Sequence, residues 1–231
     1  MATRPVFMIS DAVPYYVEKM IDFQFYSGFA EIQKKKTIRS LHEAFDKDNP
    51  NRSILEISSK SELELGVKLS AFNLIIHTKN NKRYSVESAF QASKVFENGG
   101  PYKDLLDKTS KEAKQDPRLK NSGKLKCFEF GGSRFELVPK TSFYDWVYIN
   151  TLHLHPDLAD KLMEYDSFTD IVFNPDKSVN CQARAAAIYV SLRKEGILEI
   201  TLKDKNAFLE TVYGEINICT DINVEQFSVF D

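Results

Sequence analysis

The spacing of apolar residues along the chain predicts short strands mixed with several helices. Residues 17–26 are rich in aromatic and β-branched side chains in partial alternation, which is typical of a strand. Between residues 32 and 45, Ile38, Leu41 and Phe45 recur at helical spacing among charged residues, which predicts an amphipathic helix. Further apolar runs predict strands at residues 54–58, 67–77 and 168–173.

The second half of the chain is mainly helical by the same criterion, with helices expected at residues 103–108, 110–115, 142–154, 158–165, 180–194 and 206–213. We therefore expect an α+β fold that is mainly helical, with a small β-sheet and an N-terminal strand–helix extension. The extension takes residues 1–50 and packs on a main domain of residues 51–198. Residues 199–231 form an acidic C-terminal segment.

Residues 84–96 carry the most informative pattern. Ser85 is placed to cap a helix, and an apolar face follows it. Glu87, Gln91 and Lys94 gather in a narrow polar sector at the edge of that face. Helical rise puts Glu87 and Lys94 roughly 10 Å apart at Cα, too far for an ideal ion pair and suited to bracketing a sugar. A solvated charged edge is the simpler interpretation of the same pattern.

Composition indicates an ordinary globular protein, because 42% of the 231 residues are hydrophobic and 12% are aromatic. No apolar run is long enough to cross a bilayer, and the N-terminus lacks the apolar core of a secretory signal. Cys127, Cys181 and Cys219 are odd in number and widely spaced, which disfavours a disulfide scaffold or a zinc ribbon. We expect a cytoplasmic monomer with no membrane partner.

Charge and missing motifs narrow the chemistry. The net charge is −2, and residues 199–231 carry seven acidic and two basic side chains, which is most simply ordinary charge scatter. Glycine-rich phosphate loops and the common zinc and serine-hydrolase motifs are missing. His153 and His155 lack a further ligand, so we expect no metal site and no cofactor. Side chains and helix ends would have to hold any nucleotide.

Several segments, in order, resemble the NADAR family, whose relatives process ADP-ribose derivatives. Residues 84–94 are similar to its helix with an aromatic residue and then Glu-His-x-x-Gln-x-x-Lys, here with Glu87, Gln91 and Lys94. Other matches are Leu69-Ser70-Ala71-Phe72, Tyr144-Asp145, Asp170 to Phe173 and Asn180 to Ala183. The chain is most similar to the antitoxin branch associated with the toxin DarT, through segments that include residues 40–43, 55–61, 66–72, 99–102, 143–146 and 168–170.

The resemblance implies hydrolysis of the N-glycosidic bond between ADP-ribose and guanine in DNA, with ADP-ribose as product and ligand and the cognate toxin as a possible partner. Three departures touch the pocket. Ser88 replaces the usual histidine, and Tyr144 and Phe173 replace tryptophans, which removes ring area and nitrogen donors. Glu87, Gln91 and Lys94 are all present.

Glu87, Lys94 and Asp170 are the catalytic candidates. Glu87 can stabilise a cationic anomeric carbon or move a proton. Lys94 can form an imine with the ring-opened ribose if burial lowers its pKa, or it can simply pair with a phosphate or carboxylate. Asp170 can orient a ribose hydroxyl or Lys94, or it can cap a turn.

Further residues are candidates for ligand and DNA contacts. Gln91, Ser70 and Lys60 are candidates for ADP-ribose, and Asn180 can offer its amide at a helix start, where plain N-capping is the alternative. Tyr84 and Tyr144 can stack on a base, although aromatic residues are core by default. The candidates for the DNA backbone are Lys35, Arg39, Lys82 and Arg83, for which a solvated face is the commoner explanation.

Three functions therefore compete. The first is a DNA ADP-ribosylglycohydrolase that acts as an antitoxin on ADP-ribosylated DNA. The second is an antitoxin that neutralises the toxin by binding it directly, for instance through residues 199–231. The third is a metabolic N-glycosidase that acts on amine-sugar phosphates.

Overall fold

The computed structural model describes residues 1–28 and 30–214, which fold into two compact units. Residues 1–70 and 155–214 form the first unit, and residues 71–154 form the second. Among the described residues, the second unit is one uninterrupted stretch of chain, and the first is built from the stretches on either side of it. The predicted boundaries at residues 50 and 198 stay a prediction, and most of the acidic segment lies outside the described residues.

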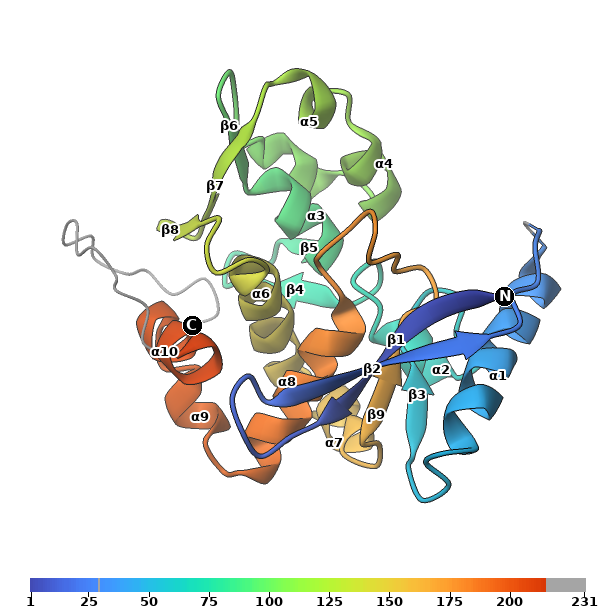
Figure 1. The fold of residues 1–231 in the computed structure, drawn as a ribbon. Coiled ribbons are helices and arrows are strands. Elements are labelled where there is room, and N and C mark those ends of the chain that lie inside the picture. The colour runs from blue at the N-terminus through green and yellow to red at the C-terminus, as the bar shows by residue number, and fades with distance from the viewer. Residues whose placement is uncertain (29, 215–231) are drawn as a thin grey trace. The chain divides into compact units, whose positions relative to one another are not determined.

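A four-stranded sheet organises the first unit, in the order β2-β1-β9-β3 (Figure 1). Strand β9 pairs antiparallel with β1 and parallel with β3. The N-terminal hairpin therefore shares a sheet with strands from the middle of the chain. The strands are β1 (Ala2–Ile9), β2 (Tyr16–Phe23), β3 (Ile54–Glu56) and β9 (Ser167–Thr169).

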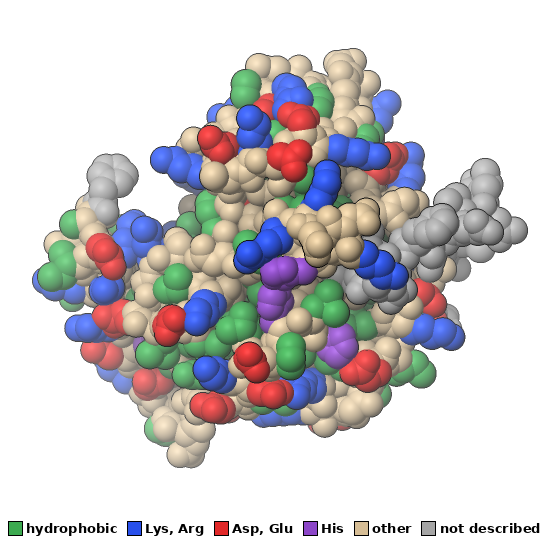
Figure 2. All heavy atoms as spheres, turned by 180° about the vertical axis from the view of Figure 1, so that it is seen from behind, with side chains coloured by type: hydrophobic (Ala, Val, Ile, Leu, Met, Phe, Trp, Pro, Cys, Tyr) green, Lys and Arg blue, Asp and Glu red, His purple; other side chains and the backbone are tan. Residues whose placement is uncertain are grey.

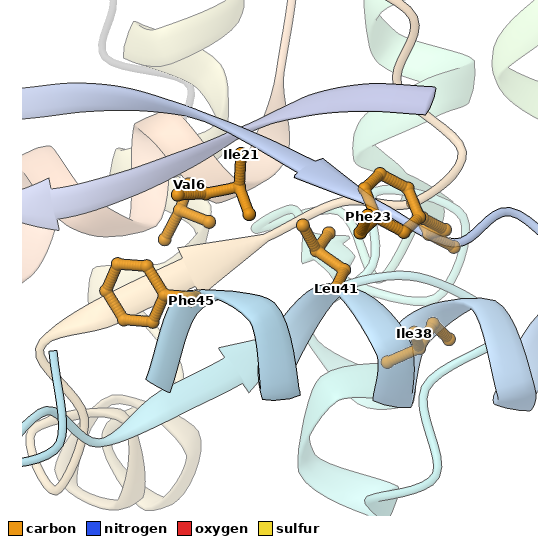
Figure 3. Close-up of a cluster of buried hydrophobic side chains, with 7 residues drawn as sticks. Val6, Ile21, Phe23, Ile38, Leu41 and Phe45 are labelled. Carbon is orange, nitrogen blue, oxygen red and sulfur yellow. The ribbon is translucent and has the colours of Figure 1, made fainter. Parts of the chain in front are cut away.

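Helix α1 (Glu31–Asp46) packs on the β1–β2 hairpin. Its apolar stripe points at the hairpin, where the side chains interdigitate (Figure 3). Ile38, Leu41 and Phe45 are at most 3% exposed, so the helix is held by burial of this stripe. The hairpin side of this core is made by Val6, Ile21 and Phe23.

The described part of the first unit has five further helices, of which α8 packs on the sheet and α9 packs on α8. Helix α8 packs on β1 and β9, and every residue from Gln182 to Leu192 is buried. Alanines at positions 183 and 185–187 let this helix approach the sheet closely. These helices are α2 (Glu64–Lys68), α7 (Pro156–Leu162), α8 (Gln182–Lys194), α9 (Leu198–Thr201) and α10 (Lys205–Tyr213).

The second unit combines two small antiparallel sheets with short helices. Its strands are β4 (Ile75–His77), β5 (Arg83–Ser85), β6 (Lys94–Phe96), β7 (Leu125–Phe130) and β8 (Ser133–Glu136). Its helices are α3 (Val86–Ala92), η1 (Lys103–Asp107), α4 (Ser110–Gln115), α5 (Arg118–Asn121) and α6 (Ser142–His153).

An aromatic cluster centred on Phe143 of α6 forms the core of the second unit. Its ring centroid lies 4.7 Å from that of Phe128 on β7 and 5.1 Å from that of Phe135 on β8. The Phe90 ring of α3 stacks on the Phe143 ring, with 6.1 Å between the two centroids. Helix α3 is therefore anchored by an aromatic side chain one residue before Gln91.

The predicted α+β class is confirmed, and the helices expected at residues 32–45, 110–115, 142–154 and 206–213 form within a residue or two of those bounds. The strand expected at residues 67–77 is wrong. Only Ile75–His77 is a strand, and Glu64–Lys68 is helix α2. Gly66 lets α2 pack against β3, because a Cβ there would lie 2.0 Å from the carbonyl oxygen of Glu56. Within the described residues, no helix combines the length and hydropathy needed to cross a membrane.

Candidate active site

Helix α3 begins with a network of serine hydroxyls. Ser85 is the N-cap, as predicted, and its Oγ accepts a hydrogen bond from the Ser88 backbone N–H at 3.0 Å. Ser88 Oγ in turn donates to the Lys108 carbonyl oxygen at 3.1 Å. Ser110 Oγ, at the start of α4, donates to Ser85 Oγ at 2.7 Å. The network therefore ties the first turn of α3 to the start of α4 and fixes the position of Glu87.

Glu87, Gln91 and Lys94 form a continuous chain of hydrogen bonds. Gln91 Nε2 donates to Glu87 Oε1 at 2.8 Å, and Lys94 Nζ donates to Gln91 Oε1 at 2.7 Å. The helical separation of four residues places Gln91 directly over Glu87. Glu87 and Gln91 are each only 5% exposed, so the carboxylate and the amide are not on a solvated edge.

Lys94 is not on the helix, which is a correction to the predicted pattern. Helix α3 ends at Ala92, and Lys94 opens β6, where it pairs with Phe128 of β7. The apolar face that suggested one long helix is divided between two elements, because Phe90 lies in α3 and Phe96 lies in β6. The amine nevertheless reaches Gln91, because the turn at Ser93 folds it back over the end of α3.

Burial shapes the chemistry of Lys94. Its ammonium lies 4.7 Å from the centroid of the Phe90 ring. Burial lowers the pKa of Lys94 to about 8, an effect that Glu87 opposes and Lys114 reinforces. A large share of this amine is therefore neutral near pH 8, and a neutral lysine is a nucleophile.

A second amine reaches the same carboxylate. Lys114 of α4 places its Nζ 3.5 Å from Glu87 Oε1 and 5.1 Å from the centroid of the Phe72 ring. The sequence predicted the helix that carries Lys114 but gave no signal of this contact, because it depends on the packing of α4 against α3.

The Gly99-Gly100 turn braces the backbone of Lys94. Gly100 has φ +89°, and a Cβ there would lie 2.2 Å from the Lys94 carbonyl oxygen and 3.2 Å from its carbonyl carbon. Phe96 N–H donates to the Gly99 carbonyl oxygen at 2.7 Å. Only glycine fits this close approach, since both the backbone conformation and the contact exclude a side chain.

We expect Gly100→Ala to destabilise the protein more than Gly132→Ala does. Both glycines have positive φ, +89° and +79°, but nothing lies within 4 Å of a Cβ at Gly132. The Gly132 variant should lose only the backbone term, about 1–2 kcal/mol. The Gly100 variant should lose about 1–3 kcal/mol more through overpacking against Lys94. Denaturant unfolding of both variants checks this, and equal losses would contradict it.

The model of a protein family described as DarT1-associated NADAR antitoxin matches residues 2–219. The chain belongs to this family. The resemblance inferred from the motifs is therefore confirmed, and with it a role as an antitoxin, in a family that is associated with DarT1. A comparison with curated proteins finds no match.

The residues at which this NADAR antitoxin departs from the family pattern contact other side chains or the backbone inside the protein. Ser88, at the position of the usual histidine, takes part in the serine network. Tyr144 lies edge-on to Phe90 at 5.3 Å, and Phe173 lies edge-on to Phe7 at 6.5 Å. Tyr84 is edge-on to Phe130, and both tyrosines are less than 9% exposed. The aromatic candidates for base stacking are thus largely buried, and their ligand role stays a prediction.

The remaining site candidates of the antitoxin belong to the first unit. Asp170 Oδ1 accepts hydrogen bonds from the backbone N–H groups of Val172 and Phe173, so this carboxylate caps the turn after β9. Asn180 does not begin α8: the N-cap is Cys181, and the helix starts at Gln182. Ser70 is buried and donates to the Val67 carbonyl oxygen, and Lys60 is exposed beyond β3.

The basic candidates for DNA differ in how they are paired. Lys35 pairs with Glu31 at 3.1 Å, and the guanidinium of Arg39 makes two hydrogen bonds to the Glu62 carboxylate. Lys82 and Arg83 are exposed in the β4–β5 hairpin. On the face that Figure 2 shows, Lys and Arg side chains are interspersed with acidic ones. DNA contact by these residues stays a prediction.

A buried carboxylate supports the turn that carries Asp170, and sequence analysis missed it. Glu56 Oε2 accepts from Thr169 Oγ1 at 2.6 Å, and Oε1 accepts from the Ile171 N–H at 2.9 Å. His42 Nε2 contacts the same Thr169 hydroxyl at 2.9 Å. The available signal was an acidic residue inside an apolar strand, Ile54-Leu55-Glu56-Ile57.

We expect Glu56→Gln to change how stability depends on pH. Burial raises the pKa of Glu56 above its usual value. The hydrogen bonds that its carboxylate accepts lower the pKa and offset part of this rise. The stability that Glu56 contributes is therefore complete at pH values below the pKa that this group has in the unfolded chain. It is lost as pH rises through the pKa that the group has in the folded protein. Melting temperatures across the acid range should show wild type losing stability relative to the variant as pH increases. A constant difference between the two would contradict this.

In the described part of the chain, no group of three or more His, Cys, Asp or Glu side chains is arranged to hold a metal ion. Cys127 and Cys181 are buried free thiols, and burial raises the pKa of each. The polar chemistry of the second unit therefore centres on Glu87, Gln91 and Lys94.

Proposed function

We propose that this antitoxin is a DNA ADP-ribosylglycohydrolase, which hydrolyses the N-glycosidic bond between ADP-ribose and guanine. The observation that supports it is the hydrogen-bonded chain Glu87–Gln91–Lys94, in which a buried carboxylate and an amine with a lowered pKa stand on either side of an amide. The family is associated with glycosidase chemistry, and its toxin partner supplies the context for ADP-ribosylated DNA.

Lys94 acts as the nucleophile in this reaction. The Nζ lone pair forms a bond to the anomeric carbon while the bond from that carbon to the guanine nitrogen breaks. A proton then moves from the lysine nitrogen to the ring oxygen, which opens the ribose and leaves a protonated imine. Water adds to the imine carbon, and the carbon–lysine bond breaks, which releases ADP-ribose and the lysine amine.

Glu87 acts as the proton donor to the departing base. The guanine amine takes up one proton as it leaves, and a carboxyl group beside the reacting carbon can deliver it. The ionised carboxylate that remains balances the positive charge on the imine. The Gln91 amide holds the carboxyl group and the amine at fixed separation through its two hydrogen bonds.

The direct test is incubation of the purified full chain with an oligonucleotide that carries ADP-ribosylated guanine, followed by mass spectrometry. The proposal expects free ADP-ribose and unmodified guanine. An unchanged oligonucleotide would overturn it. Parallel reactions with a small amine-sugar phosphate distinguish a metabolic glycosidase, which would turn over that substrate and leave the oligonucleotide intact.

A catalytic lysine with a pKa of about 8 has a predictable pH profile. Below that pH the amine is protonated and cannot attack, so kcat/KM should rise about tenfold per pH unit and bend over near pH 8. A lysine that only pairs with phosphate must be protonated, so it would give no rise below pH 8 and a fall above it. Initial rates of ADP-ribose release between pH 6 and 9.5 distinguish the two.

A further inference from the structure

Lys114 stands out because it is the half-exposed member of a buried polar site. Its side chain is 52% exposed, whereas the Glu87 side chain that it contacts is 7% exposed. Helix α4 packs directly on α3 (Figure 1). This packing brings Lys114 to the Glu87 carboxylate. We propose that Lys114 is a ligand-binding residue, which pairs with Glu87 in the free protein and with a phosphate of the bound ADP-ribosyl group during turnover. The inference rests on the proposed function.

The geometry of the contact is that of an exchangeable pair. Charge-assisted N–H···O bonds are usually about 2.7–2.9 Å long, and the Lys114–Glu87 separation is 3.5 Å. Gln91, in contrast, binds the same carboxylate oxygen at 2.8 Å. The interaction that positions Glu87 is therefore the one from Gln91, and Lys114 can leave without disturbing it.

The charges of the site favour an anionic ligand. Two amines, on Lys94 and Lys114, face a single carboxylate, on Glu87. A diphosphate is the part of ADP-ribose that carries negative charge, and lysine is a common phosphate ligand because its ammonium is a compact point charge. The Phe72 ring, with its centroid 5.1 Å from Nζ, limits the directions in which this ammonium can swing.

The test compares Lys114→Met with Lys111→Met, a matched lysine that is exposed on the same helix. Binding of ADP-ribose and of adenosine, a neutral probe, is measured by calorimetry. Loss of a charged phosphate contact should weaken ADP-ribose binding by about 10- to 100-fold in Lys114→Met and leave adenosine unaffected. The Lys111 variant should bind both ligands as wild type does.

Two further measurements make the test specific. ADP-ribose affinity should fall less between about 50 and 300 mM salt in Lys114→Met than in wild type, because one screened charge pair is missing. Lys114→Arg should recover most of the affinity, which a misfolded variant would not do. Unchanged ADP-ribose binding by Lys114→Met would overturn this inference alone. Failure of the wild type to release ADP-ribose from the modified oligonucleotide would overturn the proposed function, and the inference with it.

Discussion

Replacement of Lys94 by alanine is expected to lower the rate of ADP-ribose release by about 10³-fold or more, because the variant has no group to form the covalent intermediate. The size of the effect follows from where the Lys94 amine lies and from its burial. It hydrogen-bonds to Gln91 at 2.7 Å and rests against the Phe90 ring, so its loss removes the nucleophile and leaves the aromatic core in place.

Lys94→Arg distinguishes nucleophilic catalysis from charge pairing. Arginine keeps the positive charge but stays protonated at all accessible pH values, so it cannot form an imine. Activity comparable to that of wild type in Lys94→Arg would contradict the nucleophilic role. Lys111→Ala, on the exposed surface of α4, is the matched control and should retain full activity. Borohydride reduction during turnover should add an ADP-ribosyl mass to Lys94 in wild type and in Lys111→Ala, and should add none to Lys94→Arg.

Replacement of Glu87 by glutamine is expected to lower the rate by about 10²–10⁴-fold, the usual contribution of a positioned acid–base group. The substitution keeps the size of the side chain and removes its charge and its proton. It should also move the midpoint of the pH profile below 8, because Glu87 raises the pKa of Lys94 and that effect is lost.

The two effects of Glu87→Gln are measured together, as kcat/KM against pH. A slower enzyme with an unshifted midpoint would mean that Glu87 does not interact with the titrating amine. Rescue of toxin-expressing cells by Glu87→Gln at the wild-type level would instead favour neutralisation of the toxin by direct binding. A melting curve for the variant checks that the fold is retained.

Local patterns predicted the elements whose apolar residues repeat along a single helix. Ile38, Leu41 and Phe45 identify α1 because one stripe is enough to bury that helix. The strand expected at residues 67–77 failed because packing decides there. Gly66 allows a helix to sit against Glu56, and no local pattern records that contact. The hairpin of β7 and β8 was missed, although Gly131 and Gly132 lie at its turn.

The same division applies to the site. The spacing of Glu87 and Gln91 predicted that they share one polar sector of a helix, and in the structure their side chains are hydrogen-bonded, as residues four apart on a helix can be. Lys94 was assigned to that helix, and its true position in β6 depends on pairing with β7. Lys114 and Gly100 were not expected as parts of the site, since each reaches it through tertiary packing.

The Gln91 amide lies between the Glu87 carboxyl group and the Lys94 amine, so no proton passes directly between these two groups. A carboxylate in direct contact with a lysine would trap that lysine as its ammonium ion. Gln91 separates the two groups with a side chain that neither gains nor loses a proton in the physiological range, so it works as an insulator. The carboxyl group and the amine therefore exchange no proton directly, although they act on opposite ends of the same reaction.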